Sequence, residues 1–316
     1  MSDAHNHVGG FRVAVCIATY RRPAGLARLV RGLQLLDLEC DETLSLDVIV
    51  ADNDPAGSAS NLCAQLSGES RWTINYVAEP RRGVAFARNA AVRCALDRRA
   101  NYLALVDDDE VPNAMWLKEL WLTMTRYQAD IVAGPVLPDF EGPVARWMLA
   151  GGFFDRPRPQ TGTRLDRTRS GNVLMRADVF ERVGRLFDER FLSLGEDTDF
   201  FFHAARAGCT IVWANDAIVR ESIPESRTRV AWVLKRSYSV GIFWGLFDAD
   251  RAALRRGALR GMLKGVLWLP WSLLHGRAAS VKALQLIATG IGYLRSGAEF
   301  RFRKNQRYGV QPTRRT

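Results

Sequence analysis

One apolar run of the chain ends in four consecutive acidic residues, Asp107, Asp108, Asp109 and Glu110. Carboxylates packed this closely repel one another, and shielding from water strengthens the repulsion, so the cluster favours a bound cation. In an extended backbone alternate side chains share a side, so Asp107 and Asp109 can face one ligand while Asp108 faces away. Hard oxygen ligands suit Mg²⁺ or Mn²⁺, and an ion held by one or two carboxylates fills its remaining positions with water and phosphate oxygens. The cluster therefore indicates a metal site for a nucleotide diphosphate.

A second acidic pair, Glu196 and Asp197, lies between Gly195 and an apolar run with helical periodicity. The positive end of a helix dipole keeps a carboxylate ionised, and an ionised carboxylate can act as a base. Glycosyl transfer from a nucleotide diphosphate needs only one such base, because a metal can neutralise the departing phosphate. Both clusters have a structural alternative, since acids at these positions also cap helices, the first of them near Asn113.

The elements that position these clusters are indicated between residues 11 and 137, where short apolar runs alternate with helical periodicity. This is the pattern of a parallel sheet with crossover helices. Strands are expected at 12–18, 46–51, 73–77, 102–106 and 130–136, and helices at 24–36, 58–66, 83–98 and 114–127. Three strands end directly before polar residues, at Thr19, Asp52 and Asp107, and open α/β sheets bind their ligands at this carboxyl edge.

The chain from residue 156 to 213 combines a loop with further elements. Residues 156–169 are rich in Pro, Gly, Thr and Arg and lack apolar periodicity, so a long loop over the sheet edge is expected there. Strands are expected at 171–175 and 210–213, and helices at 177–183 and 196–207. This half of the predicted domain is α+β.

Five motifs that occur in one order along the chain together resemble those of family 2 glycosyltransferases. They are IATYRRP at 17–23, VADND at 50–54, a glycine at 83 followed by ARN at 87–89, VDDD at 106–109 and GEDTDF at 195–200. The set is far more specific than any one motif, and the resemblance covers roughly residues 10 to 240. It implies a GT-A fold, which is a Rossmann-like α/β architecture with a mostly parallel mixed sheet flanked by helices. It also implies a UDP-sugar donor, a divalent metal and an inverting single displacement.

The same resemblance implies how the donor would be bound. Asp52 would accept a hydrogen bond from the uracil N3–H, Thr19 would lie beside the base, and Arg88 would approach the base or the phosphates. The full set expected to bind the nucleotide sugar is Thr19, Tyr20, Arg21, Asp52, Arg88, Asp107, Asp108 and Glu196.

The resemblance also assigns roles within the two acidic clusters. Asp109 would coordinate the metal that bridges the two phosphates. Asp107 would touch the ribose, and Asp108 would support the site. Asp197 would be the catalytic base that deprotonates the acceptor hydroxyl.

Within the family, the strings EPRRG at 79–83, DEVP at 109–112 and GED at 195–197 are similar to the bacterial exopolysaccharide group that includes succinoglycan-type glucosyltransferases. The Gln-x-x-Arg-Trp signature of the processive synthases is missing, so addition of a single sugar is expected. The expected reaction moves one sugar, with glucose as first choice, from a UDP-sugar to a hydroxyl of a growing oligosaccharide linked to a polyprenyl diphosphate.

Two other classes of protein would also bind a nucleotide and a metal. A nucleotide-sugar-binding protein without turnover would be expected to lack the base, whereas this chain keeps Asp197. A metal-dependent nucleotidyltransferase should carry a glycine-rich phosphate loop with a lysine near the first strand, and residues 19–23 do not supply one.

The net charge of +10 comes from the C-terminal part of the chain. Residues 251–316 hold 14 Lys and Arg and one acid, whereas residues 1–250 hold 30 basic and 33 acidic residues. Basic residues between 255 and 264 recur near helical spacing among apolar ones, which is the pattern of a basic amphipathic helix that binds an anionic membrane surface. Nucleic-acid binding is not expected, because no module signature for it is present.

Three regions are expected: a disordered N-terminus at 1–10, a GT-A catalytic domain at 11–226, and a helical, membrane-associating segment at 227–316. The longest uncharged stretches of the last region hold 12 residues, short of the roughly 20 that a spanning helix needs. We therefore expect peripheral attachment to the inner face of the plasma membrane. The alternative is that these apolar residues pack on the catalytic domain or on a second subunit.

Two features of the sequence favour a cytoplasmic location. The first ten residues lack the basic-then-apolar order of a secretory signal. The five cysteines are scattered and odd in number, without metal-binding or disulfide spacing, which suits a reducing compartment.

Overall fold

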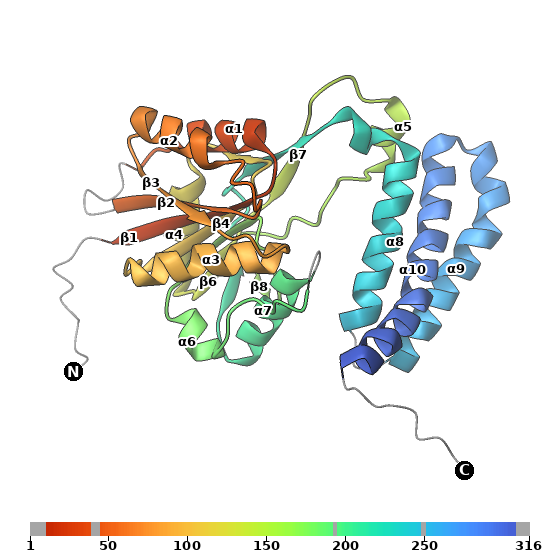
Figure 1. Cartoon of the computed structure of the whole chain (residues 1–316). Helices are drawn as coiled ribbons and strands as arrows, with labels where there is room; N and C mark the ends of the chain where they lie inside the picture. The colour runs from red at the N-terminus through yellow and green to blue at the C-terminus, as the bar shows by residue number, and fades with distance from the viewer. Residues whose placement is uncertain (1–10, 39–44, 192–194, 248–250, 308–316) are drawn as a thin grey trace, which may run out of the picture. The chain divides into compact units, whose positions relative to one another are not determined.

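The computed structural model of the protein describes residues 11–38, 45–191, 195–247 and 251–307, so the N-terminus expected to be disordered, residues 1–10, lies outside the described residues. The chain forms two compact units. The first runs to Asp139 and resumes over Asp155–Ser222, and the second comprises Phe140–Phe154 and continues from Ile223. The first unit is α/β and the second is helical (Figure 1).

A mixed sheet of eight strands forms the centre of the first unit, in the order β3-β2-β1-β4-β9-β6-β10-β8. Four neighbouring strands are parallel: β1 (Arg12–Thr19), β2 (Ser45–Asp52), β3 (Thr73–Ala78) and β4 (Tyr102–Val106). The other four are β6 (Ile131–Ala133), β8 (Arg164–Leu165), β9 (Asn172–Arg176) and β10 (Ile211–Trp213). Of these, β9 runs antiparallel to both β4 and β6, whereas β10 is parallel to β6. The sequence predicted each of the four parallel strands to within one residue at either end.

Alternation along β1 divides its side chains between two hydrophobic cores. Val13, Val15 and Ile17 are buried in one core, and Ala14 and Cys16 are buried in the other. Helices contribute to the first core from α1 (Pro23–Leu33), α2 (Ser60–Glu69) and α4 (Trp116–Tyr127). Helices contribute to the second from α3 (Val84–Asp97), α6 (Val179–Val183) and α7 (Glu196–Arg206). The predicted α/β fold, a mostly parallel sheet flanked by helices, is confirmed.

A second sheet of three strands was not expected from the sequence. Its order is β5-β11-β7, with β5 at Glu110–Pro112, β7 at Val136–Phe140 and β11 at Val219–Ile223. The strand predicted at 130–136 is two strands, β6 and β7, because Pro135 has no backbone N–H to continue the ladder. The strand β5 begins within the acidic cluster and pairs antiparallel with β11, so β-sheet pairing fixes the backbone of Glu110 opposite Glu221.

The second unit consists of helices α5 (Arg146–Gly151), α8 (Val230–Phe247), α9 (Arg251–Leu274) and α10 (Arg277–Arg307), with a short 3₁₀ turn at Glu225–Thr228. Glycines let the helix backbones approach closely. A Cβ atom at Gly241 of α8 would collide with the carbonyl oxygen of Thr289 in α10, and one at Gly265 of α9 would lie 2.7 Å from the carbonyl oxygen of Ala283. The predicted C-terminal helical extension is therefore present. Over the described residues, no helix is both long and apolar enough to cross a membrane.

Candidate active site

Three residues expected in the site meet at the carboxyl edge of the sheet. Thr19 ends β1 and lies opposite Asp52, which ends β2. The Thr19 hydroxyl donates a hydrogen bond of 2.8 Å to Oδ2 of Asp108, which follows β4. Because β1, β2 and β4 are parallel neighbours, their final residues necessarily reach the same edge.

Asp52 is turned into the protein. Its Oδ1 accepts a hydrogen bond of 3.0 Å from the backbone N–H of Asp54, and its Oδ2 accepts one of 2.8 Å from the backbone N–H of Ala59. The Tyr76 hydroxyl donates to the same Oδ2 over 3.3 Å. The residue is fully buried, so in this structure Asp52 shapes the turn beneath the site and exposes no oxygen to a nucleotide base such as uracil.

Tyr20 and Arg21 form a more accessible surface at the same edge. Arg21 has a left-handed backbone with φ of 53°, and its guanidinium donates to both carboxylate oxygens of Asp54. The guanidinium carbon of Arg82 lies 3.7 Å from the centre of the Tyr20 ring, and that of Arg21 lies 5.2 Å from it. A flat aromatic ring with cations over it suits a planar, negatively charged ligand such as a nucleotide.

The four acids after β4 differ in exposure. The side chains of Asp107 and Asp109 are 40% and 18% exposed, whereas that of Asp108 is 7% exposed. Glu110 is buried and accepts a hydrogen bond of 3.0 Å from the backbone N–H of Asp107. Burial, followed by the charge of Asp107, raises the pKa of Glu110 well above its usual value. Two carboxylates of the cluster are thus accessible, and two are anchored inside.

The cluster does not cap a helix, which was the structural alternative. Helix α4 begins at Trp116, and no side chain makes a capping hydrogen bond at its N-terminus. The acids are bound instead by Thr19, Arg22 and Arg88.

Arg22 was not among the residues expected in the site. Its Nη1 donates to Asp108 over 2.9 Å and to Asp109 over 2.8 Å, and its only signal in the sequence is its place in the IATYRRP motif.

Arg88 joins the two acidic clusters. Its Nη2 donates a hydrogen bond of 2.7 Å to Oδ1 of Asp107, and its Nη1 contacts Oε1 of Glu196. The arginine side chain is 11% exposed and the glutamate side chain 2% exposed. Burial raises the pKa of Glu196 to about 7, although Arg88 opposes the shift. The Oε2 atom of Glu196 is buried and has no hydrogen-bond partner among the described residues, so Arg88 supplies the positive charge that compensates this carboxylate.

Asp197 lies in the first turn of α7, next to Glu196. Gly195, the residue immediately before α7, has φ of 106°, a backbone conformation that residues with a side chain rarely adopt. Oδ2 of Asp197 accepts hydrogen bonds from the backbone N–H and the hydroxyl of Ser170, over 3.2 and 3.4 Å. Oδ1 accepts one of 2.6 Å from the backbone N–H of Thr198. These three hydrogen bonds fix the position of the Asp197 carboxylate at the beginning of α7.

Ser170 was missed because its position depends on the direction of a strand. It precedes β9, which pairs antiparallel with β4 so that Asn172 lies opposite Val106. The start of β9 therefore reaches the same edge as the end of β4. The apolar run at 171–175 indicates a strand but not its direction.

The fit of a divalent cation depends on Asp107 and Asp109, the two accessible members of the first cluster. Within the described ranges, no group of three or more His, Cys, Asp or Glu side chains is arranged to hold a metal. A cation here would thus have to take most of its ligands from water and from substrate phosphates, which is the usual arrangement for Mg²⁺ with one or two carboxylates. Asp107 already pairs with Arg88 and Asp109 with Arg22, so a cation would share these carboxylates with two guanidinium groups, and the described side chains do not form a closed cage.

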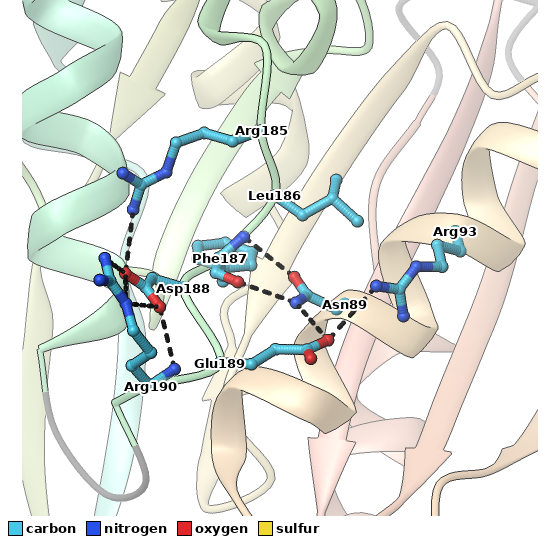
Figure 2. A pocket seen from close by; sticks show the side chains of 8 residues that line it. All are labelled: Asn89, Arg93, Arg185, Leu186, Phe187, Asp188, Glu189 and Arg190. Atoms are coloured by element: carbon cyan, nitrogen blue, oxygen red, sulfur yellow. Dashed lines mark hydrogen bonds and ion pairs between the residues drawn. The ribbon is translucent and has the colours of Figure 1, made fainter. Parts of the chain in front are cut away.

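A cavity of about 470 Å³ lies beside α3, and its lining residues do not include the strand-end acids. It is lined by Asn89, Arg93 and residues 185–190 (Figure 2). Asn89 holds the lining loop in place, because its amide donates to the carbonyl oxygen of Phe187 over 2.8 Å and accepts from the backbone N–H of Phe187 over 3.0 Å. Asn89 directly follows Arg88, so α3 contacts both this loop and Glu196 of α7.

Comparison with known families identifies the group of proteins to which this chain belongs. The model of "glycosyl transferase family 2" matches residues 14–184, and that of "glycosyl transferase family group 2" matches residues 102–294. The chain belongs to glycosyltransferase family 2 and is a glycosyltransferase.

Individual relatives agree with this placement. The succinoglycan biosynthesis protein ExoM of Rhizobium meliloti (strain 1021) is 36% identical over 258 residues, which cover 80% of each chain. A crystal structure of S. aureus TarS 1–349 in complex with UDP covers 91% of this chain and 92% of its own, with a TM-score of 0.55 and 14% identity. The complex of the same protein with UDP-GlcNAc gives a TM-score of 0.55 and 16% identity. The likeness to TarS shows a shared fold.

Proposed function

We propose that this glycosyltransferase is an inverting, metal-dependent hexosyltransferase of bacterial exopolysaccharide biosynthesis. It transfers one sugar, with glucose as the first candidate, from a UDP-sugar to a hydroxyl of a growing oligosaccharide linked to a polyprenyl diphosphate. The relative that is 36% identical is named for succinoglycan biosynthesis, and the TarS structures of the same fold hold UDP or UDP-GlcNAc. These names support the proposed donor and pathway.

The observation that carries the proposal is the contact of Arg88 with both acidic clusters. Arg88 binds Asp107 at the end of β4 and Glu196 beside Asp197. A carboxylate pair suited to a diphosphate-bound cation and a carboxylate suited to a base thus belong to one connected site. Transfer from a nucleotide sugar requires these two functions together.

In the proposed step, Asp197 takes the proton of the acceptor hydroxyl while the hydroxyl oxygen bonds to C1 of the sugar. The bond from C1 to the diphosphate oxygen breaks, and its electron pair leaves with UDP. Attack from the side opposite the leaving group inverts the configuration at C1. Ser170 orients Asp197 through its two hydrogen bonds to Oδ2. Mg²⁺ or Mn²⁺, held by Asp109 with Asp107 beside it, would neutralise charge on the departing diphosphate.

The remaining residues of the proposed site bind and orient the donor. Tyr20 and Arg21 are accessible and would contact the nucleotide, whereas Thr19, Asp52 and Asp108 are buried and would hold the floor of the site. Arg88 and Glu196 would orient the carboxylates on either side of the sugar.

The proposed acceptor is confined to a lipid bilayer, so the enzyme would work at a membrane surface. We propose that it is cytoplasmic and peripherally associated with the inner face of the plasma membrane. The 14 basic residues against one acid in residues 251–316 support this, because cationic segments are attracted to anionic lipids.

The test of the catalytic proposal is the variant Asp197→Asn, assayed for metal-dependent release of UDP from UDP-glucose in the presence of acceptor. Loss of the base should lower kcat by at least about a hundredfold. Stabilisation of the fold by UDP should persist, because Asp197 does not bind the nucleotide. Asp166→Asn is the matched control, since the Asp166 side chain is 78% exposed. Undiminished transfer by Asp197→Asn refutes the assignment, and absence of transfer by the unmodified protein with any nucleotide sugar favours a binding protein.

A further inference from the structure

One side of helix α9 exposes large apolar residues. We use the name α9 face for these residues, whose exposed fractions run from 47% at Leu259 to 84% at Leu274. They are Leu259, Leu263, Val266, Leu267, Trp271 and Leu274. The spacing of three or four residues places them along one side of the helix. Single exposed leucines are common on protein surfaces, but a continuous apolar stripe of this kind marks a surface that binds something.

The opposite side of α9 is already packed. A Cβ atom at Gly265 would lie 2.7 Å from the carbonyl oxygen of Ala283 in α10, and one at Gly290 of α10 would collide with the Met262 side chain of α9. Ser272 is fully buried on this same side. Among the described side chains of α9, the α9 face is therefore an apolar surface that stays open to a partner.

The charge around the α9 face indicates the chemistry of that partner. Residues 251–298 contain eight Lys and Arg and no acid. Arg255, Arg256, Arg260 and Lys264 are exposed on the same helix as the apolar stripe. Leucine and tryptophan beside a row of cations fit a surface that offers hydrocarbon and negative charge together, as the headgroup region of an anionic bilayer does.

A second copy of the chain fits this surface less well. Two α9 faces packed in parallel would bring Arg256 and Arg260 against the same cations of the other copy, without an acid on either helix to compensate them. An antiparallel arrangement would bring those guanidinium groups toward leucines, which leaves desolvated charges without partners.

We infer that the α9 face docks into the headgroup region of an anionic membrane, with α9 lying along the surface and its exposed cations at the lipid phosphates. Because the other side of α9 packs on α10, one side enters the lipid while the other stays against protein. This inference rests on the proposed membrane association and names the surface that carries it.

The test is flotation of the purified full-length protein with vesicles of phosphatidylcholine and phosphatidylglycerol in equal parts, and with vesicles of phosphatidylcholine alone. The unmodified protein should bind the anionic vesicles, and binding should weaken as salt is raised. Leu263→Glu/Leu267→Glu should lower the partition coefficient on anionic vesicles by about tenfold or more, because two inserted side chains become charged. Arg256→Gln/Arg260→Gln should lower it by about tenfold and reduce its dependence on salt.

The matched control variants carry the same types of substitution at exposed residues outside the α9 face. Leu35→Glu/Leu149→Glu replaces two leucines that are 74% and 59% exposed elsewhere, and Arg31→Gln/Arg99→Gln removes two exposed arginines of the first unit. Both control pairs should bind vesicles as the unmodified protein does. The inference is overturned if Leu263→Glu/Leu267→Glu keeps full vesicle binding, or if the control variants lose as much vesicle binding as it does. It is also overturned if Leu263→Glu/Leu267→Glu instead lowers the oligomeric mass measured by sedimentation.

The same variants separate this inference from the proposed catalysis. Transfer of sugar to a short, water-soluble acceptor analogue should be unchanged in Leu263→Glu/Leu267→Glu, because the substituted residues lie outside the proposed active site. Lost vesicle binding with retained transfer supports the α9 face. If the protein binds vesicles but transfers no sugar, the membrane docking of the α9 face is supported and the proposed function is refuted.

Discussion

Arg88 and Glu196 form an ion pair that is almost wholly buried, and the same guanidinium also donates a hydrogen bond of 2.7 Å to Asp107. A buried carboxylate without a counter-ion is strongly destabilising, and neither of these acids is bound by a second arginine in the hydrogen bonds of the described residues. Arg88 therefore fixes the end of β4 relative to the first turn of α7, where Asp197 lies. In the proposed site, Arg88 would position the carboxylates of both acidic clusters.

Replacing Arg88 by methionine should lower the free energy of unfolding by roughly 3–5 kcal/mol, because the buried carboxylate of Glu196 loses its counter-ion. Urea denaturation measures the change. The matched control is Arg93→Met on the same helix, whose side chain is 48% exposed and pairs with Glu189, so its loss should cost about 1 kcal/mol or less. If Arg88 served mainly to contact the nucleotide, Arg88→Met would leave stability unchanged and weaken only UDP binding.

Glu196 should make stability depend on pH in a particular direction. Burial raises its pKa from 4.5 to about 7 in the folded protein, so the unfolded chain loses this proton at lower pH than the folded one does. The contribution of Glu196 to stability is present below about pH 4.5 and is lost as pH rises toward 7, by roughly 3 kcal/mol in total.

The variant Glu196→Gln removes this titration. Between pH 4.5 and 7, the unmodified protein should lose roughly 3 kcal/mol of unfolding free energy relative to the variant. Above pH 7 the difference between the two proteins should stay constant. Glu225→Gln, at a side chain that is 76% exposed, controls for loss of a surface acid. A pH-independent difference for Glu196→Gln would contradict the expected shift.

The parallel strands and their polar ends could be predicted because each depends on local sequence. The run YLALV followed by acids gave β4 at its observed bounds, and Thr19, Asp52 and Asp108 meet because parallel neighbours end at one edge. The roles assigned to single residues came from the family resemblance and remain predictions. Asp52 in particular was expected to face the base, and in this structure both of its oxygens bind the protein.

The elements that were missed depend on pairing between distant segments. The short strands β5 and β11 carry polar residues and lack apolar alternation, and they become strands because they pair with each other. Ser170 reaches the site only because β9 runs antiparallel to β4. Arg22 bridges Asp108 and Asp109 from the beginning of α1, a contact that no spacing in the sequence indicates.

Removing divalent metal should abolish transfer if Asp109 holds a cation beside the diphosphate. Chelation with EDTA should stop UDP release, and added Mn²⁺ or Mg²⁺ should restore it. In Asp109→Asn, the Mn²⁺ concentration for half-maximal activity should rise by about tenfold or more, because a charged oxygen ligand is lost. Asp166→Asn should leave this concentration unchanged. Full activity in EDTA would exclude the proposed role of Asp109.

Close packing in the second unit should make Gly241 intolerant of any side chain. A Cβ atom there would collide with the carbonyl oxygen of Thr289, so Gly241→Ala should force α8 and α10 apart and cost about 1–3 kcal/mol. Gly257→Ala in α9 is the matched control, because nothing lies within 4 Å of its Cβ position, and alanine there should stabilise the helix by up to about 1 kcal/mol. Hydrogen exchange of the α8, α9 and α10 amides measures both effects, with faster exchange in α8 and α10 expected for Gly241→Ala and not for Gly257→Ala. Equal protection in the two variants would show that the helices do not pack through Gly241.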